Sequence, residues 1–161
     1  ADLENEYSVT VITQNVDNLH ERAGSTKVLH LHGEATKVRP EDGEYDRSYS
    51  EKEVIDIGYD EVHLGDKAPN GSQLRPHIVF FGEAVPNIEK AIDIVSAADI
   101  MLIVGTSLNV YPAAGLYRYA PNGIPIYLID PEDVAIADPR ITQIHQVATK
   151  GMETFRRMLG Q

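Results

Sequence analysis

The feature that most constrains the fold is a set of short apolar runs that end abruptly in polar or turn residues. These runs occupy residues 8–13, 100–104 and 124–129, are rich in β-branched side chains, and have the length of strands. Nearly continuous apolar strands are typical of a sheet that is covered on both faces. The sequence therefore predicts a buried, mainly parallel sheet with polar loops at its strand ends.

Helical patterns lie between and after these strands. Apolar residues recur at i, i+3, i+4 and i+7 over 88–95, with Asn87 as a candidate N-cap. Residues 112–120 are expected to form a second helix, and an amphipathic helix from about Thr149 closes the chain. The alternation of strand and helix predicts an α/β fold, a Rossmann-like parallel sheet with helices on both faces. In such sheets ligands bind at the carboxyl ends of the strands.

One stretch interrupts this pattern. Between 39 and 74 the apolar periodicity weakens and glycines supply breaks. We expect a small inserted module at 39–74, with some β-structure near 54–57 and 61–64, while 1–38 and 75–161 together form the main domain. Residues 41–66 hold ten acids and only two bases, so most of the net charge sits in this insertion.

Composition narrows the possible functions. The formal charge of −11 disfavours nucleic acid as a direct partner, because binding phosphates requires a basic surface. No apolar run approaches the roughly 18 residues of a membrane span, so we expect a cytoplasmic protein without a membrane partner. The chain has no cysteine, which excludes disulfides and thiolate metal sites. The sequence leaves the oligomeric state open.

The first candidate site follows the first strand and reads Thr13-Gln14-Asn15-Val16-Asp17-Asn18-Leu19-His20. Two amides, a carboxylate and a histidine in one strand-end loop can hold an amide-bearing ligand by matching its donors and acceptors. The alternative is a turn whose Asn and Asp side chains cap the next helix.

The second candidate is Leu29-His30-Leu31-His32-Gly33-Glu34. If the segment is a strand, His30 and His32 share one face, and Gly33 permits the close approach of a ligand. Histidine titrates near neutral pH and can take a proton from a sugar hydroxyl. Each histidine could instead be structural. The pair could also ligate a metal, but no third ligand has a suitable spacing, so we expect no metal.

Two further strand ends complete the set. Residues 74–83 read Leu-Arg-Pro-His-Ile-Val-Phe-Phe-Gly-Glu, which could offer a backbone edge to an extended peptide, with Phe80 and Phe81 either in the core or beside a substrate. Residues 105–114 read Gly-Thr-Ser-Leu-Asn-Val-Tyr-Pro-Ala-Ala, and their N–H and hydroxyl groups could contact phosphate or ribose, or simply form a turn. Asp130 could accept from ribose hydroxyls or cap its turn.

Taken in order, these four motifs resemble the sirtuin family over about 9–159, and they are most similar to its bacterial and class III branch. The resemblance implies an NAD-dependent protein-lysine deacylase: the acyl oxygen of an acyl-lysine attacks C1′ of the nicotinamide ribose, nicotinamide leaves, and the acyl group ends on ADP-ribose. It implies that acyl-lysine proteins or peptides are the substrates. Its alternatives are a non-catalytic NAD or ADP-ribose binding module and a mono-ADP-ribosyltransferase.

The resemblance also assigns residues to roles. It implies that His32 is the general base and that Asn15 and Asp17 belong to the catalytic group. The residues that it implies for NAD binding are Gln14, Asn15, Asp17, Gly105, Thr106, Ser107, Asp130 and Ala148. Those implied for the substrate peptide are Val79, Phe80, Gly82, Glu83, Asn109 and Val110. Asp130 stands where the family usually has asparagine, which adds a negative charge near the cofactor.

Two departures from the family pattern affect these expectations. The family usually carries four zinc-binding cysteines after the His-Gly segment, and this chain has none, so we expect no zinc. The glycine-rich first strand and cofactor loop of the family are also absent from this sequence, so we expect a truncated enzyme that, on its own, binds NAD poorly or not at all and is inactive. The Tyr and Arg that select acidic acyl groups belong to that absent part, which leaves deacetylase and desuccinylase both open.

Overall fold

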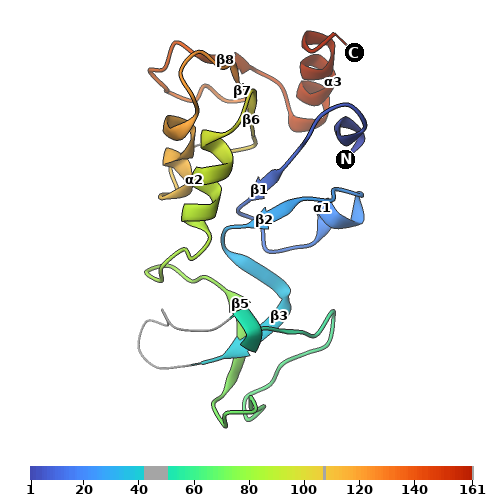
Figure 1. The fold of residues 1–161 in the computed structure, drawn as a ribbon, viewed down its shortest axis with the longest axis vertical. Coiled ribbons are helices and arrows are strands. Elements are labelled where there is room, and N and C mark those ends of the chain that lie inside the picture. The colour runs from blue at the N-terminus through green and yellow to red at the C-terminus, as the bar shows by residue number, and fades with distance from the viewer. Residues whose placement is uncertain (42–50, 107, 161) are drawn as a thin grey trace. The chain divides into compact units, whose positions relative to one another are not determined.

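The structure is a computed structural model that describes residues 1–41, 51–106 and 108–160 (Figure 1). The chain forms two compact units, Ala1–Glu89 and Lys90–Gln161. Each unit has its own strands. The expected division into 1–38 with 75–161 and an inserted 39–74 is a different partition and stays a prediction.

The first unit opens with a short 3₁₀ helix, Asp2–Asn5, and continues into a two-stranded parallel sheet. Strand β1 (Val11–Thr13) pairs with β2 (Val28–His30), so that Thr13 stands opposite His30 at the carboxyl ends. Helix α1 (Leu19–Arg22) lies between them in the chain. The β-branched run after Tyr7 thus forms a strand, and its polar continuation forms a loop at the strand end, as predicted.

The second sheet of this unit is antiparallel, with the strand order β4-β3-β5. Its strands are β3 (Gly33–Pro40), β4 (Ile55–Asp56) and β5 (Leu74–Ile78), and a 3₁₀ turn at Glu51–Glu53 precedes β4. The prediction of β-structure near 54–57 is confirmed by β4. The prediction for 61–64 is wrong, because those described residues form no strand. Residues 42–50 of the acidic stretch lie outside the described residues.

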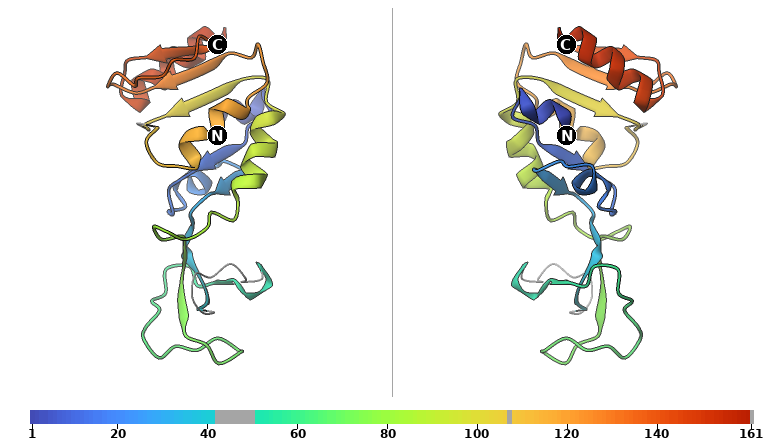
Figure 2. Two further views of the ribbon diagram at one scale, coloured as in Figure 1. Left: turned by 90° about the vertical axis from the view of Figure 1, so that its left-hand side faces the viewer. Right: turned by 90° about the vertical axis from the view of Figure 1, so that its right-hand side faces the viewer.

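The second unit contains a parallel sheet in the order β6-β7-β8 (Figure 2). Strands β6 (Met101–Val104), β7 (Ile126–Ile129) and β8 (Ile141–Ile144) run in register, with Val104 opposite Ile129 and Ile129 opposite Ile144. The runs at 100–104 and 124–129 are strands, as predicted. Strand β8 was missed, because its Thr and Gln break the apolar run.

Three helical segments accompany this sheet. Helix α2 (Ile88–Ser96) precedes β6 and buries Ala91 and Val95, which belong to the predicted apolar stripe. Segment Ala113–Tyr119 is a 3₁₀ helix that begins after Pro112, where we expected an α-helix. Helix α3 (Ala148–Met158) closes the chain, as predicted.

The core of the second unit forms where α3 meets the sheet. Ile126, Leu128 and Ile129 of β7 are fully buried. The ring centroids of Tyr127 and Phe155 lie 5.1 Å apart, edge to face. A Cβ atom at Gly151 would come within 2.2 Å of Ile129 Cγ2, so glycine lets α3 pack closely against β7.

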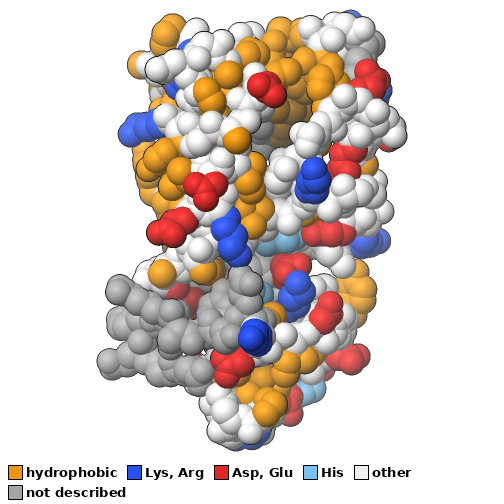
Figure 3. Space-filling view, in the orientation of Figure 1, with side chains coloured by type: hydrophobic (Ala, Val, Ile, Leu, Met, Phe, Trp, Pro, Cys, Tyr) orange, Lys and Arg blue, Asp and Glu red, His pale blue; other side chains and the backbone are white. Residues whose placement is uncertain are grey.

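Two surface properties bear on partners. On the face shown in Figure 3, acidic side chains are interspersed with lysine and arginine. This agrees with the acidic composition, and the prediction that nucleic acid is not a direct partner stays a prediction. Among the described residues, none of the helices combines the length and apolar character needed to cross a bilayer.

Candidate active site

The first unit brings two sequence motifs to one edge of a sheet. Because β1 and β2 are parallel and end together, the turn at Gln14 and the segment at Leu31 leave the sheet side by side. The Leu31 amide donates to the Thr13 carbonyl at 2.9 Å, which continues the ladder by one step. The Asn15 amide then donates to Thr13 Oγ1 at 3.0 Å and turns the chain.

Both histidines of the His-x-His motif contact this turn. Nδ1 of His32 lies 3.1 Å from the Gln14 carbonyl oxygen, and Nδ1 of His30 lies 3.0 Å from the Asn15 carbonyl oxygen. The strand β2 ends at His30, however, and His32 occupies a bend before β3. The two histidines therefore do not share one continuous strand, which was one condition considered for this segment, but both rings reach successive carbonyls of one turn.

The contact at His32 assigns its tautomer. A carbonyl oxygen can only accept a hydrogen bond, so Nδ1 of His32 must carry the proton. Nε2 then holds the lone pair in the neutral ring. A histidine oriented in this way can accept a proton at Nε2 without changing its contact with the main chain.

His30 has a second partner. Its Nε2 lies 2.8 Å from Glu21 Oε1, and only 6% of the residue is exposed. Burial disfavours the charged ring, but the hydrogen bonds to Glu21 and to the Asn15 carbonyl outweigh burial and raise the pKa of His30. Burial likewise opposes the charged carboxylate of Glu21, yet the hydrogen bond from His30 outweighs it and lowers the pKa of Glu21.

Glu34 brings a third possible ligand atom, since those of Glu21, His30 and Glu34 all lie within 4.8 Å of one another. Such a cluster could hold a cation. Both ring nitrogens of His30 already face oxygens, and Glu34 pairs with Lys37. These ion pairs explain why the three groups lie together, and the expectation of no metal stays a prediction.

Gly33 was expected to permit the close approach of a ligand, and in the structure it permits the close approach of protein backbone. It has φ +80°, and a Cβ there would lie 2.0 Å from the His77 carbonyl oxygen. The backbone that approaches Gly33 is therefore that of β5 within the protein. The Val79 amide also donates to the His32 carbonyl at 2.9 Å, so β5 and its continuation hold the segment that carries the candidate base.

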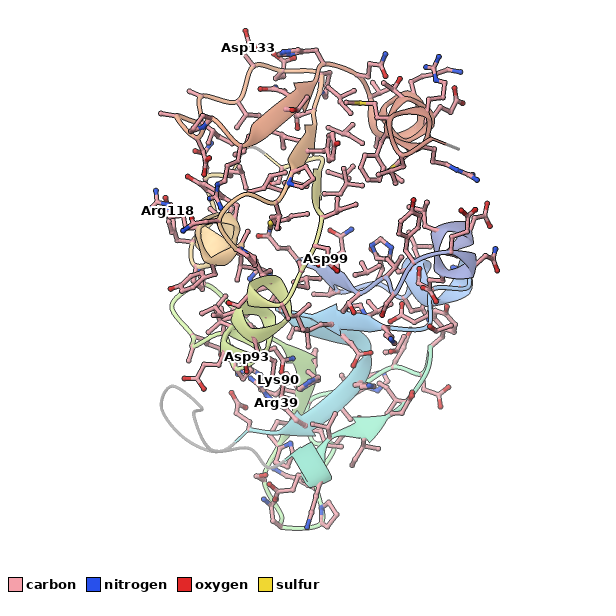
Figure 4. The ribbon with its side chains drawn as sticks, turned by 45° about the horizontal axis from the view of Figure 1, so that its top comes forward. Arg39, Lys90, Asp93, Asp99, Arg118 and Asp133 are labelled. Atoms are coloured by element: carbon pink, nitrogen blue, oxygen red, sulfur yellow. The ribbon has the colours of Figure 1, made fainter. Side chains whose placement is uncertain are left out.

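The turn after β5 is held by Glu83. Its Oε1 accepts from Arg75 Nη1 at 2.7 Å, and its Oε2 accepts from the Phe80 amide at 2.9 Å. Arg39, which projects from β3 in Figure 4, lies 3.6 Å from the same carboxylate and is 2% exposed. Burial opposes ionisation of Glu83, but the hydrogen bond from Arg75 outweighs it and lowers the pKa of Glu83.

The two phenylalanines of this turn lie at the surface. Phe81 is fully exposed and Phe80 is 53% exposed, with the Arg75 guanidinium 4.7 Å from the Phe80 ring centroid. Of the two alternatives for these rings, the core position is wrong. Gly82, at φ +91°, is also exposed.

The second unit gathers a different group at the carboxyl edge of its sheet. Gly105 follows β6 and donates to the Ile129 carbonyl at 2.9 Å, and Asp130 follows β7 and donates to the Ile144 carbonyl at 3.3 Å. Ala148 starts α3 shortly after β8. Gly105 has φ +61° and no atom within 4 Å of the position of a Cβ, so this backbone is open to a ligand.

Several candidate polar groups also have local structural roles. Asp17 Oδ1 accepts from the Leu19 amide at 3.1 Å, and Asp130 Oδ1 accepts from the Glu132 amide at 2.9 Å. Thr106 Oγ1 accepts from the Leu108 amide at 3.2 Å. Each carboxylate retains further acceptor capacity, so these turn contacts are compatible with ribose binding. Ser107 lies outside the described residues, and Asn109 and Val110 are exposed.

The structure thus brings the predicted residues together in two groups, one in each unit. The joint contact of both groups with one NAD molecule stays a prediction from the sequence. The roles of His30 and Glu21 were missed, because nothing in the sequence shows that residues nine positions apart meet. The one available signal was the opposite charge that a histidine at the end of one strand and a glutamate in the helix after the preceding strand can carry.

The parallel strands with polar groups at their carboxyl ends define an α/β protein of the Rossmann-like class. A model described as the Sir2 family matches residues 1–112, so the chain belongs to the Sir2 family, the sirtuins. The recognised resemblance and the α/β fold class are both confirmed.

Similar proteins agree with this assignment. The chain is 54% identical over 160 residues to an NAD-dependent protein deacylase of Bacteroides thetaiotaomicron, covering 99% of this chain and 68% of that protein. A Sir2 homologue in complex with ADP-ribose is 32% identical with a TM-score of 0.78, and the match covers 99% of this chain and 65% of the other. A Sir2 structure with a p53 peptide and NAD⁺ is 30% identical with a TM-score of 0.73, and the match covers 100% of this chain and 68% of the other. Two further curated relatives are matched over only 59% and 54% of their own length.

Proposed function

We propose that the protein is an NAD-dependent protein-lysine deacylase, a deacetylase or desuccinylase that transfers the acyl group to ADP-ribose and releases nicotinamide. The observation that carries this proposal is the orientation of His32, whose Nδ1 is held by the Gln14 carbonyl at 3.1 Å. The lone pair on Nε2 makes His32 suited to proton transfer. Membership of the Sir2 family supports the choice of reaction.

The donor sets present are suited to NAD. Gln14 and Asn15 offer side-chain amides that match the carboxamide of nicotinamide, and Asp17 offers a carboxylate for ribose. Gly105, Thr106 and Ser107 would face phosphate and ribose, Asp130 the adenosine ribose, and the Ala148 backbone the adenine. The open backbone at Gly105 supports this assignment. When bound, NAD supplies a ribose carbon from which nicotinamide departs as a leaving group.

In this proposal His32 accepts a proton at Nε2 from a ribose hydroxyl. The proton then rests on an imidazolium whose Nδ1–H still donates to the Gln14 carbonyl. The Val79 amide, which donates to the His32 carbonyl, limits movement of the residue during this transfer. His32 thereby moves one proton without a rearrangement of its main-chain contacts.

Acyl-lysine peptides are the proposed substrates. Val79, Phe80, Gly82 and Glu83 in the first unit and Asn109 and Val110 in the second would contact the peptide as an added strand. The exposed turn at Phe80 and Phe81, braced by Arg75 and Glu83, supports this role. Because the Val79 amide already donates to His32, and Glu83 already binds Arg75, Val79 and Glu83 would act mainly through other main-chain atoms.

The test is a product analysis on the full-length protein that carries this chain, with acetyl-lysine and succinyl-lysine peptides and NAD. We expect equal amounts of nicotinamide and O-acyl-ADP-ribose by mass spectrometry. Calorimetric binding of NAD or ADP-ribose without turnover would instead indicate a non-catalytic binding module. ADP-ribose found on protein would indicate a mono-ADP-ribosyltransferase, and either result would refute the deacylase proposal. Fractionation of cells tests the proposed cytoplasmic location.

A further inference from the structure

The surroundings of His30 carry an inference about the candidate cofactor pocket. His30 is buried, and both of its ring nitrogens face oxygen atoms, Nδ1 toward the Asn15 carbonyl at 3.0 Å and Nε2 toward Glu21 Oε1 at 2.8 Å. Its own main chain is held as well, since Asn87 Nδ2 donates to the His30 carbonyl at 2.8 Å. Two groups therefore hold the ring, and a third holds the main chain of the same residue.

This geometry requires two N–H groups on the ring. A neutral imidazole has one N–H donor and one acceptor nitrogen, so in the neutral state a lone pair would face either the carbonyl or the carboxylate. Only the imidazolium donates to both. The raised pKa of His30, in which its hydrogen bonds outweigh the effect of burial, and the lowered pKa of Glu21 agree with this ion pair.

We propose that the His30–Glu21 ion pair is a positioning device that holds the Gln14–Asn15 turn in the conformation that binds the nicotinamide end of NAD. His30 does not touch the cofactor in this scheme; it acts through the Asn15 main chain. The proposal rests on the proposed function for the identity of the cofactor, whereas the charged state of His30 rests on geometry alone.

The two carboxylates that act most strongly on His30 favour the imidazolium. Glu21 approaches from α1, and the charge of Glu34 on β3 acts in the same direction. Lys37 pairs with Glu34 and partly offsets it, and His20 on α1 acts on Glu21.

Deprotonation of His30 would therefore loosen the turn. Above its raised pKa the ring keeps one proton and must give up either the Asn15 carbonyl or the Glu21 carboxylate. The affinity for NAD should fall on the alkaline side, while the turnover rate with saturating NAD should change little, because His32 keeps its own carbonyl contact at Gln14.

The test uses Glu21→Gln, which keeps the shape of the side chain and removes its charge, and His30→Gln, which keeps only one donor group. The controls are Glu6→Gln and His63→Gln, exposed residues of the same unit. Nitrogen-15 NMR of the ring nitrogens of this chain follows the titration of His30, and amide shifts follow Gln14 to Val16. Steady-state kinetics of the full-length protein give KM for NAD and kcat from pH 6 to pH 10.

We expect both ring N–H groups of His30 to be present at neutral pH. Glu21→Gln should move the titration of His30 to lower pH, and the alkaline rise in KM for NAD should move with it, with kcat changing less than about twofold. His30→Gln should raise KM about tenfold, the equivalent of one charge-assisted hydrogen bond. The controls should behave as the parent does.

A neutral His30 ring at pH 6 to 7 would overturn the proposal, as would an unchanged KM profile in Glu21→Gln. A fall in kcat and in thermal stability that accompanies an equal rise in KM would show that His30 is only a structural residue, and this result would also refute the proposal. If the full-length protein shows no NAD-dependent turnover, the proposed function fails. The NMR titration and the amide shifts of the turn still decide, on this chain alone, whether the ion pair holds the turn.

Discussion

His32 donates from Nδ1 to the carbonyl oxygen of Gln14, 3.1 Å away, at the end of the strand that precedes it in the sheet. This contact joins the candidate base to the turn that is expected to hold the cofactor. It also determines which ring nitrogen is available for proton transfer. The position of the proton on the His32 ring therefore depends on the parallel pairing of β1 with β2, which brings Gln14 next to His32.

Gly33 should tolerate no side chain. In Gly33→Ala a Cβ would lie 2.0 Å from the His77 carbonyl, at a backbone φ of +80° that disfavours alanine. We expect a loss of about 2 kcal/mol or more in the free energy of unfolding, measured by urea denaturation. Gly58→Ala is the matched control, because Gly58 also has a positive φ but no neighbouring atom within 4 Å. Equal losses in both variants would contradict the role of close packing.

Gly151 should be required for the packing of α3 against β7. Alanine is a better helix former than glycine by about 1 kcal/mol, yet a Cβ here would meet Ile129 Cγ2 at 2.2 Å inside a fully buried cluster. We expect Gly151→Ala to unfold at a lower temperature, with a net loss of about 1 to 2 kcal/mol. The exposed neighbour Thr149, changed to Ala, should cause no such loss. A stabilised Gly151→Ala variant would show that the helix has room to move.

Glu83 should contribute to stability in a way that depends on pH. Its pKa is lower in the folded state, because the hydrogen bond from Arg75 outweighs the opposing effect of burial. The stabilisation is therefore present above the unfolded value of about 4.3 and is lost as the pH falls through the folded pKa. Urea denaturation should show the largest difference between wild type and Glu83→Gln at pH 6 to 7, and little difference below the folded pKa. A difference that persists unchanged at pH 2 would contradict the ion-pair account.

NAD should perturb residues of both units. If Gln14 and Asn15 in the first unit and Gly105 and Asp130 in the second contact one cofactor, titration of the full-length protein with NAD should shift their amide NMR signals together with a single dissociation constant. The signals of Gly65 and Gly71, glycines of the predicted insertion, provide the control. Shifts confined to one unit, or two different dissociation constants, would refute a shared cofactor.

The sequence predicted β1, β6 and β7, because their apolar runs are unbroken and end at polar turns. It predicted α2 and α3 from one apolar stripe each. It failed at β8, where polar residues alternate with isoleucine, and at residues 61–64, where a short apolar pattern has no partner strand. These failures have a common cause, since a strand of two to four residues is determined by its neighbours in space.

In the candidate site, too, some features were predictable from the sequence and others arise only in the folded chain. The motifs identified the polar groups, because amides, carboxylates and histidine have distinct chemistry wherever they lie. They did not identify the ion pair of His30 with Glu21 or the clamp of Glu83 by Arg75 and Arg39, since these contacts arise from tertiary packing. Gly33 was correctly marked as a close approach, but the approaching group is the backbone of β5.

His32 is tested most directly as the general base by the turnover of His32→Gln in the full-length protein, compared with His63→Gln, under saturating NAD and acyl-lysine peptide. If His32 accepts the ribose proton, the rate of O-acyl-ADP-ribose formation should fall by about 10²- to 10⁴-fold, with NAD still bound. His63→Gln should stay within about twofold of the parent. Near-normal turnover in His32→Gln would contradict the assignment of His32 as the general base.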